Sequence, residues 1–484
     1  MRKQVVSGFF WRLMERMGAQ IVSFVVSIIL ARILNPDIYG TIALITVFTT
    51  IMQVFVDSGL GNALIQKRQA DDIDFSTVFY FNVIFCVLIY GVMWISAPSI
   101  AMFCNNITLV PLIRVLSLTI VVSGVKNVQQ AYVSRNMLFK KFFFSTLCGT
   151  IGAAIIGIYM AIRGFGAWAL IAQQLFNLTI DTLILWITVP WRPRKFFSFE
   201  RLRLLLSYGW KLLASSLLDT GYNNLRQLLL GKYFTLADLA FYNQGDKFPA
   251  LITHNINASI DSVLLPVMSQ DQDNKQRVHN MTRRSIMIST YLMSPMLIGL
   301  AACADTLVLL LLTDKWMPCV PFLRIFCIGY VFYPIHTANL NAIKAMGRSD
   351  IFLKLEVIKK VVGLIVLIYF IRISVMALAW SALAMGILSI ILNAWPNKQL
   401  LNYSIQVQLG DILINLLPAL IMGGLVYAAG LIIMPPVFKL IFQIIIGIVV
   451  YLALSLILKN PSYKYLLNML KSGIAKHQNA KMQE

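Results

Sequence analysis

The feature of this sequence that most constrains its fold is a series of apolar segments, most of them long enough to cross a lipid bilayer. A crossing helix needs about 20 mostly apolar residues, and its backbone must satisfy its own hydrogen bonds. The segment at 236–266 is the weakest, because polar residues such as Asp246 and Lys247 interrupt it. The sequence predicts an all-α polytopic membrane protein with about fourteen transmembrane helices. Their approximate positions are 10–34, 38–63, 76–97, 108–132, 142–162, 166–189, 207–231, 236–266, 284–312, 318–343, 352–371, 374–395, 411–433 and 437–457.

Composition excludes several other classes of protein. Hydrophobic residues make up 58% of the 484 residues and charged residues only 13%, whereas soluble domains contain roughly a quarter charged residues. This balance excludes a soluble enzyme, a disordered chain and a secreted disulfide scaffold. The six cysteines form no C-x-x-C pair, so we interpret them as small apolar packing residues.

The net charge of +21 would suggest a nucleic-acid partner in a soluble protein, but basic residues also accumulate in the cytoplasmic loops of membrane proteins. If the N-terminus is cytoplasmic, most lysines and arginines of the connecting segments fall on the inner side. This bias predicts that both termini are cytoplasmic, and no nucleic acid is expected as a partner. The basic residues that remain in the outer connections are Arg32, Arg163, Lys232, Lys315, Arg372 and Lys439.

The chain contains an internal repeat on either side of a basic linker, Trp191–Arg203. The residues around Trp11 are echoed around Trp210, and Pro111-Leu-Ile-Arg is echoed by Pro321-Phe-Leu-Arg. Each half contains about six spans, an even number, so the halves should share one orientation and form a parallel repeat. The predicted organisation is an N-terminal lobe (1–195), a C-terminal lobe (196–400), two further spans (401–458) and a basic cytoplasmic tail (459–484) that contacts anionic membrane lipids.

Two equivalent helices contain matching polar stripes at helical spacing. Every member of the second stripe lies 199 positions after its counterpart in the first, so both stripes should face the interface between the halves. Polar groups within membrane spans are costly in lipid and usually face a wet interior. The first stripe is Arg12, Arg16, Gln20, Ser23 and Ser27, and the second is Lys211, Ser215, Asp219, Tyr222 and Arg226.

Further charged residues extend the predicted site. We expect a wet cationic vestibule that binds an anionic group, because arginine and lysine attract phosphate and carboxylate. The alternative is that these residues form internal ion pairs that hold helices together. Candidates for binding a coupling H⁺ or Na⁺ are Asp219, Asp246 and Asp261. The predicted substrate-binding residues are Arg12, Arg16, Gln20, Lys126, Lys211, Arg226, Lys247 and Lys344.

The sequence contains no recognisable enzyme signature. It has no H-E-x-x-H, no nucleotide-binding glycine loop, no G-x-S-x-G and no paired-carboxylate motif, and its four histidines are scattered. Neither a metal site nor a cofactor is expected. Any transport would therefore depend on an ion gradient or on substrate flow.

Several motifs resemble those of a known family. They are Ser7-Gly-x-x-Trp11, Asp57-Ser-Gly-Leu-Gly-Asn-Ala-Leu-Ile-Gln66, Leu265-Pro-Val-Met-Ser-Gln-Asp-Gln272, Asp314-Lys-Trp316 and Ala345-Met-Gly-Arg-Ser-Asp350. Together they resemble the Wzx-type polysaccharide-transport flippases, especially the colanic-acid and lipopolysaccharide exporter branch, of the multidrug/oligosaccharidyl-lipid/polysaccharide exporter superfamily.

The resemblance implies a flippase of the bacterial inner membrane for undecaprenyl-pyrophosphate-linked oligosaccharide repeat units. It also implies alternating access between two six-helix lobes, a cationic central cavity, and a polysaccharide polymerase and chain-length machinery as partners. Two other functions stay open at this point. A drug antiporter of the same superfamily would export organic cations and should have an acidic cavity. A membrane-embedded polymerase should have a large outer loop with catalytic residues, whereas every outer connection expected here is short.

Overall fold

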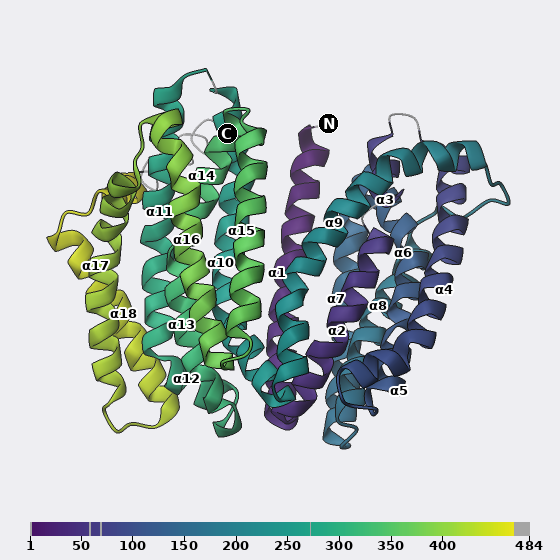
Figure 1. The fold of residues 1–484 in the computed structure, drawn as a ribbon, viewed down its shortest axis with the longest axis horizontal. Helices are drawn as coiled ribbons and strands as arrows, with labels where there is room; N and C mark the ends of the chain where they lie inside the picture. The colour runs from purple at the N-terminus through teal and green to yellow at the C-terminus, as the bar shows by residue number, and fades with distance from the viewer. Residues whose placement is uncertain (1, 58–59, 68–69, 272, 469–484) are drawn as a thin grey trace, which may run out of the picture. The chain divides into compact units, whose positions relative to one another are not determined.

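The computed structural model describes residues 2–57, 60–67, 70–271 and 273–468. Throughout this described part the secondary structure is helical, with no β-strand. Eleven of its helical segments are long and apolar enough to cross a membrane. The chain divides into two compact units, residues 1–240 and 241–484, and each is described here by itself (Figure 1).

Unit 1 contains the first nine helices and the first turn of the tenth. Helix α7 packs against both α1 and α8, α4 packs against α6, and α2 packs against α9. The bounds of its helices are α1 Arg2–Ile33, α2 Pro36–Asp57, α3 Leu60–Gln66, α4 Asp72–Phe103, α5 Leu109–Leu116, α6 Leu118–Arg135, α7 Phe139–Ile162, α8 Ala167–Thr188 and α9 Phe199–Tyr233.

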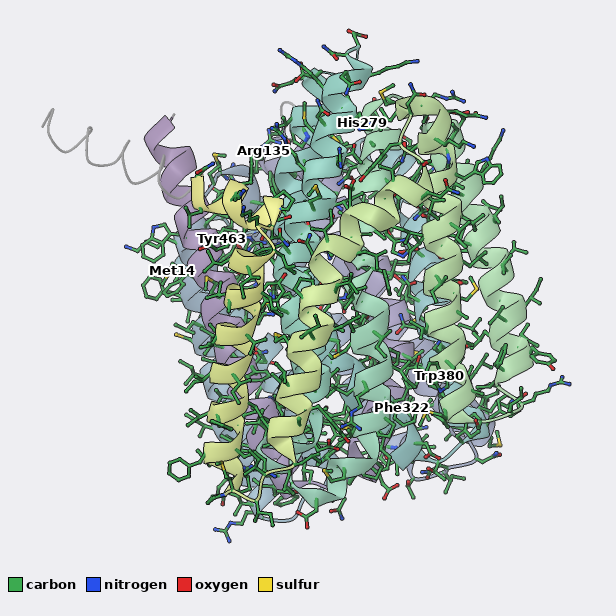
Figure 2. All side chains as sticks on the ribbon, turned by 90° about the vertical axis from the view of Figure 1, so that its left-hand side faces the viewer. Met14, Arg135, His279, Phe322, Trp380 and Tyr463 are labelled. Carbon is green, nitrogen blue, oxygen red and sulfur yellow. The ribbon has the colours of Figure 1, made fainter. Side chains whose placement is uncertain are left out.

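Unit 2 is organised around α11, which packs against α13, α14 and α17, while α17 also packs against α18. The outward side chains of α17 and α18 are largely hydrocarbon, as expected for helices that face lipid (Figure 2). The bounds of its elements are α10 Leu236–Gln270, α11 Lys275–Ala302, α12 Ala304–Leu311, the 3₁₀ helix η1 Asp314–Cys319, α13 Val320–Val331, α14 Tyr333–Ala345, α15 Ser349–Phe370, α16 Val375–Leu401, α17 Ile405–Gly430 and α18 Pro436–Ile457.

The same helix pattern recurs in the two halves of the chain. Helix α1 ends at Ile33 and α9 ends at Tyr233, and the next helix begins three residues later in both cases. The turns after α6 and α14 also correspond, because Met137 and Gly347 both have positive φ, 55° and 71°. Glycine adopts this left-handed backbone conformation at little cost, whereas methionine does so only when its surroundings enforce it.

Three long helices, α9, α10 and α15, are not among the eleven apolar segments. Helices α9 and α10 contain 35 residues each, and α15 contains 22. Their lower apolar character follows from charged and amide side chains along their length, including the second polar stripe in α9. Length alone would allow each of them to span a bilayer, since an α-helix rises about 1.5 Å per residue.

The linker between α8 and α9 is fastened to the beginning of α4. Arg201 forms an ion pair with Asp71 at 2.5 Å, and the backbone N–H of Arg194 donates to the Ser76 hydroxyl at 2.9 Å. The hydrogen bond from Arg201 lowers the pKa of Asp71 to about 2. The linker also inserts Trp191, which is 5% exposed, into the core of unit 1. These contacts hold the beginning of α9 on unit 1.

Helix α2 crosses the α9–α10 connection at very short range. A Cβ atom at Gly40 would lie 1.8 Å from the carbonyl oxygen of Leu236, and one at Gly231 would lie 2.5 Å from a methyl group of Leu44. Real Cβ atoms do not approach other atoms so closely. The crossing therefore requires glycine at position 40, where the obstacle is backbone, whereas a methyl group at position 231 would displace the Leu44 side chain.

Candidate functional site

Unit 1 contains an open polar cavity of about 470 Å³ among α1, α3, α6, α7 and α8. Helix α6 supplies the largest share of its polar side chains, and their spacing places them along one helix face. The lining residues are Arg12, Glu15, Gly61, Asn62, Ile65, Lys126, Asn127, Gln130, Ala131, Ser134, Phe142, Thr146 and Asp181.

A buried ion pair spans this cavity from α6 to α8. The ammonium of Lys126 lies 2.5 Å from Oδ2 of Asp181, and the two side chains are only 13% and 9% exposed. The other carboxylate oxygen, Oδ1, is buried and has no hydrogen-bond partner among the described residues. Buried polar atoms are usually paired. The Asp181 carboxylate thus retains unused capacity to accept a hydrogen bond inside the cavity.

A second ion pair stands at the cavity on α1. Arg12 donates to Glu15 at 2.7 Å, with the arginine side chain 42% exposed and the glutamate side chain 12% exposed. The Arg12 guanidinium also lies over the Phe142 ring, 5.1 Å from its centroid. The Thr146 hydroxyl donates to the remaining Glu15 oxygen at 3.4 Å. The two basic and two acidic lining residues balance one another in formal charge.

Beside α6, a network of side-chain amides forms part of the cavity wall. Asn127 donates to the backbone carbonyl of Val56 at 3.1 Å and accepts a hydrogen bond from Asn82 at 3.4 Å. A Cβ at Gly61 would lie 2.6 Å from the Asn127 amide oxygen, so glycine allows α3 to approach α6. The network fixes the face of α6 on which Lys126 lies.

The structure brings only part of the sequence-predicted set to this cavity. Arg12 and Lys126 line it, whereas Arg16 is exposed on α1 and Gln20 is half-buried one turn further along. On α9, Asp219 accepts a hydrogen bond from Asn223 at 3.2 Å and Arg226 is half-buried. The side chain of Lys211 lies outside the described residues.

The remaining predicted residues belong to unit 2. Lys247 is half-buried on α10, and Lys344 lies 4.4 Å from the centroid of the Phe352 ring. Asp246 accepts a hydrogen bond from the Tyr330 hydroxyl at 3.0 Å, and Asp261 accepts one from Asn341 at 2.6 Å. Both aspartates thus accept hydrogen bonds from neighbouring helices of unit 2.

Sequence reasoning missed Asp181 and Glu15 as members of the site. An aspartate in the otherwise apolar segment 166–189 is itself a signal, because charged residues inside spans usually have a function or a partner. Glu15 was also visible, since it follows Arg12 by three residues and therefore shares its helix face.

Residues 29–321 match the family described as polysaccharide biosynthesis protein. This match covers more than half of the 484 residues. The chain belongs to this family. With eleven described segments that are long and apolar enough to cross a membrane, it is a multi-pass membrane protein of polysaccharide biosynthesis.

Relatives of this chain are distant in sequence but align over most of it. The succinoglycan biosynthesis transport protein ExoT of Rhizobium meliloti (strain 1021) is 22% identical over 72% of this chain and 71% of its own. The teichuronic acid biosynthesis protein TuaB of Bacillus subtilis (strain 168) is 25% identical over 72% and 73%. The lipopolysaccharide biosynthesis protein WzxC of Escherichia coli (strain K12) is 23% identical over 74% and 73%.

Solved structures support the fold of this family member. The lipid II flippase MurJ, in an inward closed conformation, aligns with a TM-score of 0.73 at 15% identity, covering 96% of this chain and 100% of that one. An inward-facing multidrug resistance transporter of the MATE family aligns with a TM-score of 0.62 at 13% identity, covering 80% and 98%. At these identities the likeness concerns the fold alone.

Proposed function

We propose that this protein translocates undecaprenyl-pyrophosphate-linked oligosaccharide repeat units from the cytoplasmic to the outer leaflet of the bacterial inner membrane. The units would serve the assembly of a surface polysaccharide such as lipopolysaccharide O-antigen, capsule or exopolysaccharide. The observation that carries the proposal is the polar cavity of unit 1, which holds Lys126, Asp181 and Arg12 within an apolar helix bundle. The relatives' printed roles in succinoglycan, teichuronic acid and lipopolysaccharide biosynthesis support this substrate class.

The cavity meets the main physical difficulty of moving a sugar across a bilayer. Each hydroxyl that enters hydrocarbon without a hydrogen bond costs several kcal/mol, about 4–8 kcal/mol on the most apolar reference scale. Side chains such as Asn62, Gln130 and Ser134 can replace water as partners for those hydroxyls. The polyprenyl tail meanwhile stays in lipid, where it has no such cost.

The charged pairs suit an anionic headgroup only if they exchange partners. Lys126 is neutralised by Asp181 in the described structure, so a pyrophosphate would have to compete with that carboxylate. Arg12 is the more accessible cation, because its side chain is 42% exposed. We propose that Arg12 makes the first contact with phosphate and that Lys126 follows. The other predicted cations, Arg16, Lys211, Arg226, Lys247 and Lys344, would add positive potential along the route.

The same proposal includes the finer architecture expected from the sequence. Adding α9, α10 and α15 to the eleven apolar segments gives fourteen spans, arranged as two six-helix lobes (1–195 and 196–400) followed by α17 and α18. We propose alternating access between the lobes with both termini cytoplasmic. Asp219, Asp246 and Asp261 remain the proposed sites for a coupling H⁺ or Na⁺, and the polymerase and chain-length machinery remain proposed partners.

The test is a flipping assay with the purified full-length protein in proteoliposomes. Undecaprenyl-pyrophosphate carrying a labelled oligosaccharide is supplied in one leaflet, and its arrival in the other is followed with a membrane-impermeant glycosidase. We expect protein-dependent transfer that Arg12→Ala slows at least about tenfold, because a charge-assisted hydrogen bond contributes about 1.5–3 kcal/mol. Arg163→Ala is the matched control, since Arg163 is exposed in the α7–α8 connection.

Two results would overturn this function. One is transfer that is no faster than in protein-free vesicles for several oligosaccharides. The other is ethidium efflux in a pump-deficient strain without any sugar transfer, which would favour the drug antiporter. In the flipping assay, Arg16→Ala and Arg226→Ala should each also slow transfer while leaving membrane insertion intact. Wild-type transfer rates in both variants and in the double variant would show that these two residues do not contribute to the route.

A further inference from the structure

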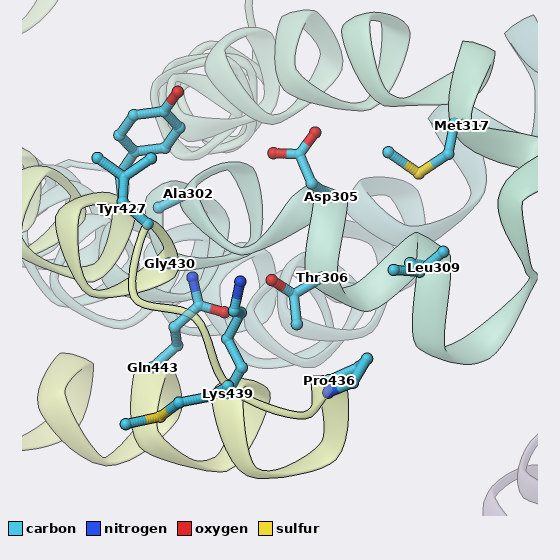
Figure 3. A pocket seen from close by; sticks show the side chains of 12 residues that line it. Ala302, Asp305, Thr306, Leu309, Met317, Tyr427, Gly430, Pro436, Lys439 and Gln443 are labelled. Carbon is cyan, nitrogen blue, oxygen red and sulfur yellow. The ribbon is translucent and has the colours of Figure 1, made fainter.

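Unit 2 contains a second cavity, and none of the residues assigned above lines it. It has a volume of about 300 Å³ and lies where α12 and the 3₁₀ helix η1 meet the adjoining ends of α17 and α18 (Figure 3). Its polar lining comes from Asp305, Thr306, Tyr427, Lys439 and Gln443. Nothing in the proposed transport route uses these residues, so the cavity needs its own explanation.

The innermost polar group of this cavity is an incompletely bonded amide. Gln443 is 2% exposed, and its Nε2 donates to the backbone carbonyl of Val426 at 3.1 Å. Its Oε1 is buried and accepts no hydrogen bond from any residue that the structure describes. A Cβ at Gly430 would lie 2.6 Å from Nε2, so glycine leaves space for this amide. The site therefore offers a buried acceptor to a ligand that has a hydroxyl donor.

The cavity also presents a cation and a carboxylate. Lys439 is half-buried, and no carboxylate lies within ion-pair distance of its ammonium in the described residues. Figure 3 shows Lys439, Gln443 and Thr306 directed to the same space. Asp305 is held by an ion pair with Arg324, whose guanidinium lies 5.8 Å from the centroid of the Tyr427 ring. The lysine thus remains available for an anionic ligand, and the arginine fixes the opposite wall.

The connection between α17 and α18 beside this cavity contains no polar side chain. The connection and the first turn of α18 read Leu-Ile-Ile-Met-Pro-Pro-Val-Phe from Leu431 to Phe438, and Ile433 is 99% exposed while Phe438 is 66% exposed. Such a surface is unfavourable in water and favourable in the acyl region of a bilayer. A cavity beside such a surface suits the boundary between headgroups and acyl chains, where a lysine can extend its ammonium to the polar side.

We propose that this cavity binds the headgroup of an anionic glycerophospholipid that carries free hydroxyls, of the phosphatidylglycerol type. Its phosphate binds Lys439, a headgroup hydroxyl donates to Oε1 of Gln443, and its acyl chains lie along the apolar connection. A zwitterionic lipid lacks the net negative charge that Lys439 selects. Phosphatidic acid has the charge but lacks the headgroup hydroxyls.

The test measures lipid binding to the full-length protein by native mass spectrometry in detergent, with phosphatidylglycerol, phosphatidic acid, phosphatidylcholine and free glycerol phosphate as probes. We expect phosphatidylglycerol to bind most tightly and free glycerol phosphate to bind little, because it has no acyl chains. Lys439→Ala should weaken phosphatidylglycerol binding about tenfold, as expected for loss of one charge-assisted hydrogen bond. Lys354→Ala, which removes an exposed lysine from α15, is the matched control and should leave binding unchanged.

The Gln443→Leu variant tests the contact with the headgroup hydroxyl separately from the contact with the phosphate. This variant should bind phosphatidylglycerol and phosphatidic acid equally, whereas the wild-type protein should prefer the former. Equal binding of phosphatidylglycerol and phosphatidylcholine by the wild-type protein would overturn the proposal, and so would equal losses in Lys439→Ala and Lys354→Ala. Displacement of phosphatidylglycerol by undecaprenyl pyrophosphate at a much lower concentration would assign the cavity to the transported lipid instead. Gln443→Leu is also tested in the flipping assay. Because the lipid site is separate from the unit 1 cavity, sugar transfer by this variant tests the proposed function independently of lipid binding.

Discussion

The ion pair between Lys126 and Asp181 allows a test that separates a structural role from a binding role. Both side chains are more than 85% buried, and their charged atoms lie 2.5 Å apart. Removing one member of such a pair strands the other charge and costs about 3–5 kcal/mol, whereas replacing both with apolar residues is often neutral or stabilising. Lys126→Met should therefore lower the free energy of unfolding by about 3–5 kcal/mol, a large part of the roughly 5–15 kcal/mol typical of folded proteins.

The stranded carboxylate explains why the cost should be at the upper end of this range. In Lys126→Met, neither oxygen of Asp181 would have a partner among the described residues, because Oδ1 has none even in the intact pair. The double variant Lys126→Met/Asp181→Leu should regain stability to within about 1 kcal/mol of the wild-type protein. Unfolding is followed by tryptophan fluorescence in detergent as a double-variant cycle, which isolates the coupling between the two residues.

The same double variant then enters the flipping assay. If the pair contacts the transported headgroup, the variant should be stable and at least about tenfold slower in transfer. If the pair only joins α6 to α8, transfer should recover together with stability. A double variant whose loss of stability equals the sum of the two single losses would refute the reasoning, because it would show that the two charges do not compensate each other in the folded protein.

Two further predictions concern the fold. Gly40→Ala should destabilise the protein by about 1–3 kcal/mol, the usual cost of overpacking, because its Cβ would lie 1.8 Å from the carbonyl oxygen of Leu236. The control Gly91→Ala, whose Cβ meets nothing within 4 Å, should be neutral or stabilising. Equal melting temperatures of the two variants would contradict the prediction. Arg201 lowers the pKa of Asp71 to about 2 in the folded protein, whereas an aspartate in the unfolded chain has a pKa of about 4. Asp71 therefore stabilises the fold above about pH 4, and this stabilisation disappears as the pH falls toward about 2. Arg201→Gln should flatten the dependence of the free energy of unfolding on pH between about 4 and 2, and an unchanged pH profile would exclude the linkage.

The helical architecture could be predicted from the sequence because hydrophobic length is a local property. Helix α2 begins at Pro36 and α18 ends at Ile457, each within two residues of the expected segment. The internal repeat could also be anticipated, since similar offsets recur in the helices, 200 residues between Ile33 and Tyr233 and 210 between Met137 and Gly347. The polar helices α9 and α10 were harder to delimit, because their charged residues weaken the apolar signal while the helices themselves run on for 35 residues.

The candidate site was predictable only in part, and the reason is sequence distance. Lys126 could be singled out as a cation inside a span, but its partner Asp181 lies on another helix, and no spacing rule connects residues on different helices. The attachment of the beginning of α9 to α4 could not be predicted for the same reason, because it depends on the ion pair between Arg201 and Asp71, which lie far apart in the sequence. Helical periodicity identifies which face a side chain occupies and leaves open which neighbour that face meets.

The segment that follows α18 is fastened to the helices before it. Asn460 is 1% exposed and donates to the side chain of Asn415 on α17 at 2.9 Å, while Asp411 on the same helix is clamped by Arg283 of α11 at 2.7 Å. A fluorophore or spin label placed next to Asn460 would consequently move together with the helices of unit 2. Such a reporter could time the movements of that unit during turnover without any modification of the cavity in unit 1.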